Sequence, residues 1–372
     1  MSNIGFAVDL GTTTIDYCLV DMMDCHVIEQ SSFLNPQSLY GSDVINRIMT
    51  ITRDAAFAEV LKSQVVDALN THFISMLDHN GYVSSDVSRI SICGNTTMVS
   101  ILLGRDVKCL GEAPFIPDLK DDVCISANQL FGDESGLVCP VILSGCASAF
   151  VGGDILTGMN YLKDYYSAEA FANSNCLFID LGTNGEIVLY TNNQYYGAAT
   201  ACGPAFEGCT RRQKVYGATT IETIALCVSL GKILPNGSFA KDSMEQLTVN
   251  GVTLTLDVLH SILLAKAAIA AGIETICEQA TVQMEDIDYV YLAGGFGFHL
   301  DLESAIKIGL IPKTLKDKIK IVGNTSLEGA KLFLNDKYIS RINKDTMKIL
   351  NFAEIPSYQD KFIQNMYFQP IN

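Results

Sequence analysis

The chain has 372 residues, and its 25 Lys and Arg against 41 Asp and Glu leave a formal charge of −16 at pH 7. This length exceeds what one hydrophobic core usually supports, and a hydrophobic content of 48% is enough for two. The acidity argues against nucleic acid and against an anionic membrane as partners. The amino terminus shows no export signal, and the most apolar stretch, Val258–Ile276, carries charged residues. We therefore expect a cytoplasmic protein without a membrane-spanning segment.

The first half of the chain alternates predicted strands and helices. An apolar stripe at helical spacing predicts the longer helix, and a stretch rich in Pro, Asp and Gly at about residues 109–138 is predicted to be an insertion. The expected elements are a hairpin of Ile4–Asp21 with His26–Phe33, helices over Gly41–Thr52 and Ala55–Leu77, a strand over Arg89–Cys93 and a helix over Gly152–Tyr165.

The second half starts with a similar hairpin and then departs from the first. A helix-forming segment is expected near Ala205, turn signals mark an insertion at about residues 230–255, and a long helix is predicted over Leu256–Glu278. We place the first lobe at residues 1–172 and the second at residues 173–372.

One short phrase occurs twice. Asp9–Thr14 reads Asp-Leu-Gly-Thr-Thr-Thr, and Asp180–Glu186 reads Asp-Leu-Gly-Thr-Asn-Gly-Glu. Each copy follows an apolar run, so a buried strand delivers an Asp into a tight turn, where N–H groups and hydroxyls are donors for phosphate. A carboxylate beside phosphate repels it unless a hydrated Mg²⁺ lies between them. Either copy alone is typical of a simple turn. The pair predicts two phosphate turns that clamp one nucleotide.

Other segments recur in the same order after each copy. A strand stopped by glycine comes next, and then a strand that leads into a turn of small residues. This three-element duplication predicts two similar halves that face one another. The recurring segments are Ile90–Asn95 with Val290–Gly297, and Val141–Asp154 with Ile319–Ala330.

This layout resembles the superfamily of acetate and sugar kinases, heat-shock proteins and actin. The phrases at Asp9 and Asp180 resemble its two phosphate motifs, and Ala293–Gly297 resembles its adenosine motif. The resemblance implies an α/β fold, namely a duplicated actin-like (ribonuclease H-like) two-lobed ATPase fold with a nucleotide cleft between the lobes. It also implies ATP and Mg²⁺ as cofactors.

Three phrases together are more specific than any one glycine motif. Gly94–Met98, Gly203–Gly208 and Ala293–Gly297 resemble the ATP-binding domain of the reductive activators of corrinoid enzymes. Membership implies an ATPase that supports reduction of Co(II) to Co(I) in the corrinoid protein of a methyltransferase system. It also implies a corrinoid protein as partner and a homodimer.

The resemblance assigns roles to individual residues. Asp9 and Asp180 correspond to the carboxylates that hold Mg²⁺ through water, and Asp154 to the residue that orients an attacking water, with Glu186 and Glu207 as alternatives. The positions implied to bind the phosphates or the nucleoside are Gly11, Thr12, Thr13, Gly182, Thr183, Asn184, Gly203, Glu207, Gly294, Gly295 and Gly297.

The twelve cysteines include no Cys-x-x-Cys pair, so no iron–sulfur motif is evident. Most are expected to be buried, reduced thiols. Cys146, Cys202 and Cys209 lie near glycine-rich turns and are the candidates for a cluster if the fold or a second subunit brings them together.

The chain departs from typical reductive activators because it starts almost directly on the first phosphate strand, without the amino-terminal 2Fe-2S ferredoxin-like domain. We therefore expect a separate electron donor. Three alternatives stay open. One is a small-molecule kinase of the same superfamily, since the motifs do not separate hydrolysis from phosphoryl transfer. The others are an activator like those of the dehydratases, with a 4Fe-4S centre between two subunits, and a non-catalytic, ATP-sensing chaperone module.

Overall fold

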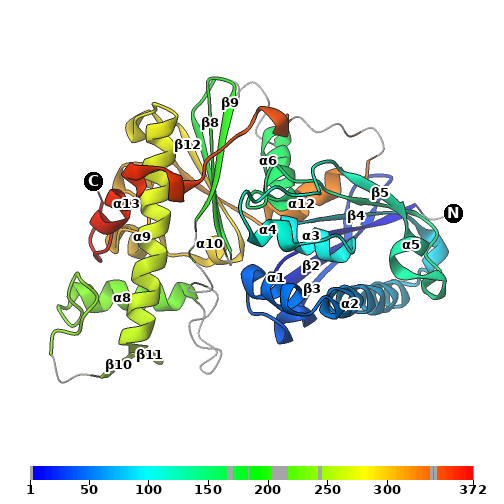
Figure 1. The fold of residues 1–372 in the computed structure, drawn as a ribbon, viewed down its shortest axis with the longest axis horizontal. Helices are drawn as coiled ribbons and strands as arrows, with labels where there is room; N and C mark the ends of the chain where they lie inside the picture. Colours follow the sequence, from blue (N-terminus) through cyan, green and yellow to red (C-terminus); the bar gives the residue numbers. More distant parts are fainter. Residues whose placement is uncertain are drawn as a thin grey trace. The chain divides into compact units, whose positions relative to one another are not determined.

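The chain folds into two compact units. The computed structural model describes residues 3–165, 171, 173–182, 184–200, 202, 206, 217–241, 245–335, 338 and 342–371. The first unit comprises residues 1–166 and 325–345, and the second comprises residues 167–324 and 346–372. Figure 1 shows the elements of both along the chain.

The described part of the first unit contains one six-stranded sheet in the order β3-β2-β1-β4-β6-β5. The hairpin partners β1 and β2 are antiparallel, whereas β1, β4 and β6 run parallel. Strand β5 comes from the segment that the sequence analysis treats as an insertion, and it pairs antiparallel with β6 at the sheet edge. The strands are β1 (Ile4–Leu10), β2 (Thr14–Asp21), β3 (Val27–Leu34), β4 (Val87–Gly94), β5 (Val123–Ser126) and β6 (Pro140–Leu143).

Side chains alternate between the two faces of this sheet. Phe6, Val8 and Leu10 belong to the larger apolar core, together with buried residues of α2 and α3. Small residues such as Ala7 lie on the opposite face, against α12. The helices of this unit are α1 (Val44–Arg53), α2 (Ala56–Asn80), α3 (Thr96–Leu102), α4 (Lys108–Gly111), α5 (Ala127–Phe131), α6 (Gly153–Tyr165) and α12 (Thr325–Leu332).

Helix α12 is distant in sequence from the rest of the first unit. The sequence-based division assigned its residues to the second lobe, whereas the structure packs residues 325–345 with the first unit. The reason is apolar contact, because Leu327, Ala330 and Leu334 form a small core with Ala7 and Cys93. The backbone carbonyl of Ser326 also accepts a hydrogen bond from the Cys93 thiol (3.2 Å).

The second unit contains, among its described residues, a six-stranded sheet in the order β13-β12-β7-β8-β9-β14. Strands β7 and β8 are antiparallel, and β7, β12 and β13 are parallel. The separate hairpin β10–β11 lies within the predicted insertion. The strands are β7 (Cys176–Leu181), β8 (Gly185–Thr191), β9 (Gln194–Thr200), β10 (Gln246–Val249), β11 (Val252–Thr255), β12 (Tyr289–Ala293), β13 (Ile319–Gly323) and β14 (Lys348–Ile349).

Helix α9 is the central helix of this unit, and Figure 1 shows it in yellow-green with α13 beside it. By length and apolar composition alone α9 is long enough to cross a membrane, but two thirds (67%) of its most apolar window is buried within the fold. Residues such as Ile269 and Ile273 belong to the main apolar core, so α9 is a core helix. The described helices are α8 (Gly217–Ser229), α9 (Leu256–Gln279), α10 (Gly295–His299), α11 (Leu302–Lys307) and α13 (Pro356–Gln364).

The two sheets share five strands in the same spatial order, which confirms the predicted duplication. Strands β3, β2, β1, β4 and β6 correspond to β9, β8, β7, β12 and β13. The sixth strand differs, because β5 extends the first sheet beyond β6 whereas β14 extends the second beyond β9. The repeated Asp-Leu-Gly phrases therefore lie at the same position in each unit, at the end of the central strand.

Candidate functional site

In the first unit, Asp9 lies near the carboxyl end of the central strand β1. It is paired with Asp16 across the hairpin and with Cys93 on the parallel strand β4. Burial raises the pKa of the Cys93 thiol, and the charges of Asp9 and Asp154 raise it further. A Cβ on Gly152 would lie 2.6 Å from both the Asp154 Oδ1 and the Cα of Asn95, which directly follows β4. The structure therefore places Asp9 and Asp154 at the carboxyl ends of the neighbouring strands β1 and β4.

Asp154 is the second residue of α6 and is partly buried. Burial raises the pKa of its carboxyl from 3.8 to about 6, although a hydrogen bond from the Ile155 N–H (2.9 Å) opposes this shift. A carboxyl group with such a pKa is ionised at neutral pH and still basic enough to accept a proton from water or a hydroxyl. This chemistry fits the predicted role of Asp154.

The turn after β1 has a tightly constrained backbone. A Cβ on Gly11 would lie 2.3 Å from the Thr14 carbonyl oxygen, so only glycine fits there. Thr12 is buried, and its hydroxyl accepts a hydrogen bond from the Asn95 amide (2.9 Å). Asn95 also caps α3 by accepting from the Met98 N–H. The segment Gly94–Met98, which resembles the reductive activators of corrinoid enzymes, thus contacts the predicted phosphate turn through Asn95.

In the second unit, Asp180 occupies the position that corresponds to Asp9. It is paired with the buried Glu186 across the hairpin and with Ala293 on β12. Gly294 follows Ala293 with a φ of +87°, and a Cβ there would lie 2.5 Å from the Asp180 Oδ1 and from the Leu181 carbonyl oxygen. The predicted adenosine motif therefore begins directly against the predicted magnesium carboxylate.

The other predicted residues of the second unit are less constrained. Gly182 donates its N–H to the Asn184 carbonyl (3.0 Å), and among the described residues a Cβ on Gly182 would meet no atom closer than 3.9 Å. Gly295 begins α10, and a Cβ on it would meet no described atom within 4 Å, whereas Gly297 packs on Leu292 of β12. Thr183, Gly203, Glu207 and Cys209 lie outside the described residues.

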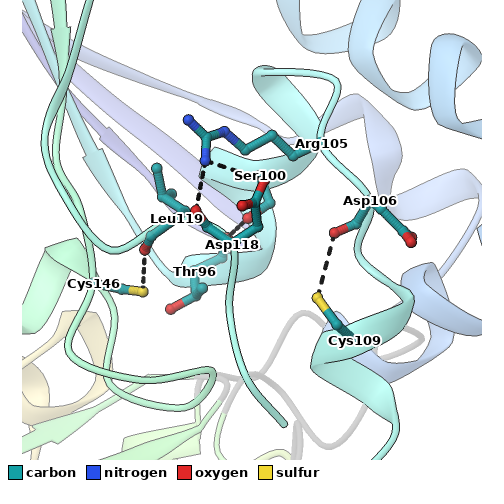
Figure 2. A network of polar contacts seen from close by, with 8 residues as sticks. All are labelled: Thr96, Ser100, Arg105, Asp106, Cys109, Asp118, Leu119 and Cys146. Carbon is teal, nitrogen blue, oxygen red and sulfur yellow. Dashed lines mark hydrogen bonds and ion pairs between the residues drawn. The ribbon is translucent and has the colours of Figure 1, made fainter.

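The described cysteines of interest are buried. Cys146 is buried and donates its thiol to the Leu119 carbonyl, as Figure 2 shows. The same segment is held by Arg105, whose guanidinium donates to the Asp118 carbonyl (2.7 Å). Burial raises the pKa of the Cys146 thiol, which disfavours the thiolate that a cluster needs. Cys202 is also buried, with its Sγ against Gly185.

Sequence reasoning missed two residues beneath the first turn. Asn35 donates its side-chain amide to the Gly11 carbonyl (2.9 Å), and the fully buried Arg47 donates to the Thr12 carbonyl (2.5 Å). Neither residue belongs to a recognisable motif. The one feature of the sequence that could have indicated Arg47 is the presence of an arginine within the predicted helix 41–52.

The residues present fit the cofactors that the sequence implies. In each unit the hairpin sets an Asp directly opposite a second acid, Asp9 with Asp16 and Asp180 with Glu186. Like charges at such positions repel one another, and a cation would relieve the repulsion. Carboxylate oxygens suit Mg²⁺, and the space left by the absent Cβ of Gly294 lies against one of them.

Comparisons with known families agree with this arrangement. Residues 4–164 match the family profile described as the RACo middle region. Residues 174–215 and 215–372 match the profile described as the C-terminal domain of RACo, the ASKHA domain.

Among curated proteins, this chain is similar to the corrinoid activation enzyme RamQ of Eubacterium limosum, with 27% identity over 98% of this chain and 70% of that protein. It is also similar to the Co(II) methylated amine-specific corrinoid protein reductase of Methanosarcina barkeri, with 23% identity over 90% of this chain and 70% of that protein.

A solved structure of a reductive activator for a corrinoid, iron–sulfur protein matches with a TM-score of 0.86 and 25% identity. The match covers 99% of this chain and 66% of that one, so this chain spans about two thirds of its length. The duplicated α/β architecture is therefore the actin-like fold of the ASKHA class. Because a RACo profile covers more than half of it, the chain belongs to the RACo family.

Proposed function

We propose that this protein is an ATPase that supports the reductive activation, from Co(II) to Co(I), of a corrinoid protein in a methyltransferase system. The observation that carries the proposal is that each unit places an Asp at the turn of its central hairpin, within a chain matched throughout by RACo profiles. The names of the similar curated proteins, a corrinoid activation enzyme and a corrinoid protein reductase, support the same reaction.

In this proposal the described residues bind and orient the nucleotide. Asp9 and Asp180 would hold Mg²⁺ through water. Gly11, Thr12 and Thr13 with Gly182 bind phosphate oxygens by N–H groups and hydroxyls. Bound magnesium would neutralise charge on the phosphates, and the protein's contribution to ATP hydrolysis is mostly placement and charge stabilisation.

Asp154 is the proposed group that orients the attacking water and takes its proton. Its raised pKa, about 6, supports this role, because the carboxylate is ionised near neutral pH and is a better base than an ordinary Asp. Cys93, which pairs with Asp9 across the strands, keeps its thiol proton, since burial and both carboxylates raise its pKa.

The corrinoid protein and the electron source complete the proposal. ATP binding or hydrolysis drives an uphill reduction if the protein binds the two states of its corrinoid partner with different affinity. The twelve cysteines include no Cys-x-x-Cys pair, and Cys146 and Cys202 are buried. We therefore propose that a separate protein donates the electron. A cytoplasmic location and a homodimer stay predictions.

The test is anaerobic mixing of the protein with candidate corrinoid proteins, a reductant and MgATP. We expect ATP-dependent loss of the Co(II) spectrum together with phosphate release. Asp9→Ala and Asp180→Ala should each lower turnover about 100-fold, because each removes a charge that the bound cation needs. Asp24→Ala is the matched control, since Asp24 is exposed in the β2–β3 turn and pairs with His26.

Two results would contradict the proposal. One is a Co(II) spectrum that responds equally with and without ATP for every corrinoid protein. The other is ATP turnover that rises sharply with a sugar or acyl acceptor and transfers phosphate to it, which would make the protein a kinase. Unchanged ATP binding in both Asp variants would refute the assignment of the carboxylates.

A further inference from the structure

Each backbone carbonyl of the turn at residues 11–13 accepts a hydrogen bond from a residue outside the turn. The Gly11 carbonyl accepts from the Asn35 side chain (2.9 Å), and the Thr13 carbonyl accepts from the Asn35 N–H (2.8 Å). The Thr12 carbonyl between them accepts from the Arg47 guanidinium (2.5 Å). Three consecutive carbonyls are thus fixed by two residues that lie outside the turn.

The directions of these carbonyls also determine the directions of the neighbouring N–H groups. In a trans peptide the C=O of one residue and the N–H of the next point in opposite directions. Since the carbonyls of Gly11 and Thr12 point toward Asn35 and Arg47, the N–H groups of Thr12 and Thr13 point away from them. The turn therefore directs the N–H groups of Thr12 and Thr13 away from the residues that fix its carbonyls.

Arg47 is an unusual residue for this position. Its side chain is fully buried, and removing a guanidinium from water is costly unless its donors are satisfied. The guanidinium donates to Gln37 Oε1 (2.9 Å) and the Gly41 carbonyl (3.2 Å) as well as to Thr12. Gln37 is itself fixed, because its amide donates to the Leu61 carbonyl (2.9 Å).

The segment Gly94–Met98 also contacts Thr12, Arg47 and Asn35. Asn95 donates to the Thr12 hydroxyl, and the Met98 sulfur contacts both the Arg47 guanidinium and the Asn35 amide. Arg47 from α1 and Asn95, the N-cap of α3, therefore fix the carbonyl and the hydroxyl of Thr12. Asn35, the N-cap of the 3-10 helix Pro36–Leu39, fixes the carbonyls of Gly11 and Thr13 on either side.

We propose that Arg47 and Asn35 are positioning residues for the phosphates of the nucleotide. They act through the turn at residues 11–13, by fixing its carbonyls so that its amides are aligned before a ligand arrives. This inference rests on the proposed function, because it requires that the ligand of the turn is a nucleotide phosphate. It predicts that the two residues affect binding of ATP and ADP but not of adenosine.

The experiment measures dissociation constants of ATP, ADP and adenosine by calorimetry, with Mg²⁺ present, for the full chain and for Arg47→Lys, Arg47→Met and Asn35→Ala. We expect ATP and ADP to bind at least tenfold more weakly, and adenosine within twofold of the wild type. Arg47→Lys keeps the charge but loses the fork that reaches several acceptors, so it separates alignment from charge. Thermal melting identifies variants that do not fold. If Arg47→Met does not fold, the dissociation constants of Arg47→Lys and Asn35→Ala decide the test.

Arg105→Met is the matched control. Arg105 also holds a backbone carbonyl in the first unit, that of Asp118 (Figure 2), and the contacts described for its guanidinium are with Asp118. It should leave all three dissociation constants unchanged. Equal weakening of ATP and adenosine, or ATP affinity unchanged in folded variants, would overturn the inference alone. A wild-type protein that binds neither ATP nor ADP would overturn the proposed function with it.

Discussion

The two units place the same hairpin and the same Asp at equivalent positions, but they constrain the adjoining backbone differently. In the first unit the tight contact is within the turn, where Gly11 meets the Thr14 carbonyl and Arg47 fixes Thr12. In the second unit a Cβ on Gly182 would meet no described atom closer than 3.9 Å. The glycine that ends the neighbouring strand is tightly packed in both units, Gly94 against the Leu10 carbonyl (2.7 Å) and Gly294 against Asp180 (2.5 Å), but only Gly294 has a positive φ. The difference teaches that a duplicated motif conserves the position of its carboxylate while each copy fixes it by its own contacts.

The largest expected effect comes from Gly294. Gly294→Ala places a Cβ at a φ of +87° and 2.5 Å from the Asp180 Oδ1, so both backbone strain and overlap oppose it. We expect a loss of roughly 3–5 kcal/mol in unfolding free energy, measured by urea denaturation. Gly295→Ala is the control, because a Cβ there meets no described atom within 4 Å and should change stability by less than about 0.5 kcal/mol. Equal losses in the two variants would show that the contact of Gly294 with Asp180 is not the constraint.

A second comparison replaces the corresponding glycine of each turn, Gly11 or Gly182, with alanine. Gly11→Ala would put a Cβ 2.3 Å from a backbone oxygen and should destabilise the protein by about 1–3 kcal/mol, whereas Gly182→Ala, with 3.9 Å available, should be tolerated. Urea midpoints of both variants check this. If the turns bind phosphate, Gly182→Ala should still weaken ATP binding while the fold is kept. Identical stability of the two variants would contradict the difference between the turns.

The sequence was sufficient for the features that are local. The hairpins, the Asp at each turn and helix α9 follow from strand alternation, glycine-ended strands and helical periodicity, and the structure confirms them. It was not sufficient for contacts that join distant segments. The packing of α12 with the first unit depends on apolar side chains more than 300 residues after Ala7, and no pattern near residue 325 specifies that partner. Asn35 and Arg47 were missed for the same reason, since their acceptors are backbone carbonyls that any sequence provides.

A third comparison distinguishes the units by the charge that each buries. Burial raises the pKa of Asp154 to about 6 in the first unit and lowers that of Lys266, which donates to the Tyr367 carbonyl, to about 7 in the second. The folded state holds the Asp154 proton more tightly than the unfolded chain, so stability falls as pH rises from about 4 to 6. For Lys266 the unfolded chain holds the proton more tightly, so stability falls as pH decreases from about 10 to 7.

Asp154→Asn and Lys266→Met should therefore change the pH dependence of stability in separate windows. As pH rises from 4 to 6, the stability of Asp154→Asn should increase relative to that of the wild type, and above pH 7 the difference should stay constant. Lys266→Met should gain as pH decreases from 10 to 7 and stay level below 6, with a constant loss from the unpaired Tyr367 carbonyl. Urea midpoints at five pH values from 4 to 10 measure both curves. If the two difference curves had the same shape, their pH dependence would come from the overall charge of −16, and the burial of these two residues would not be its cause.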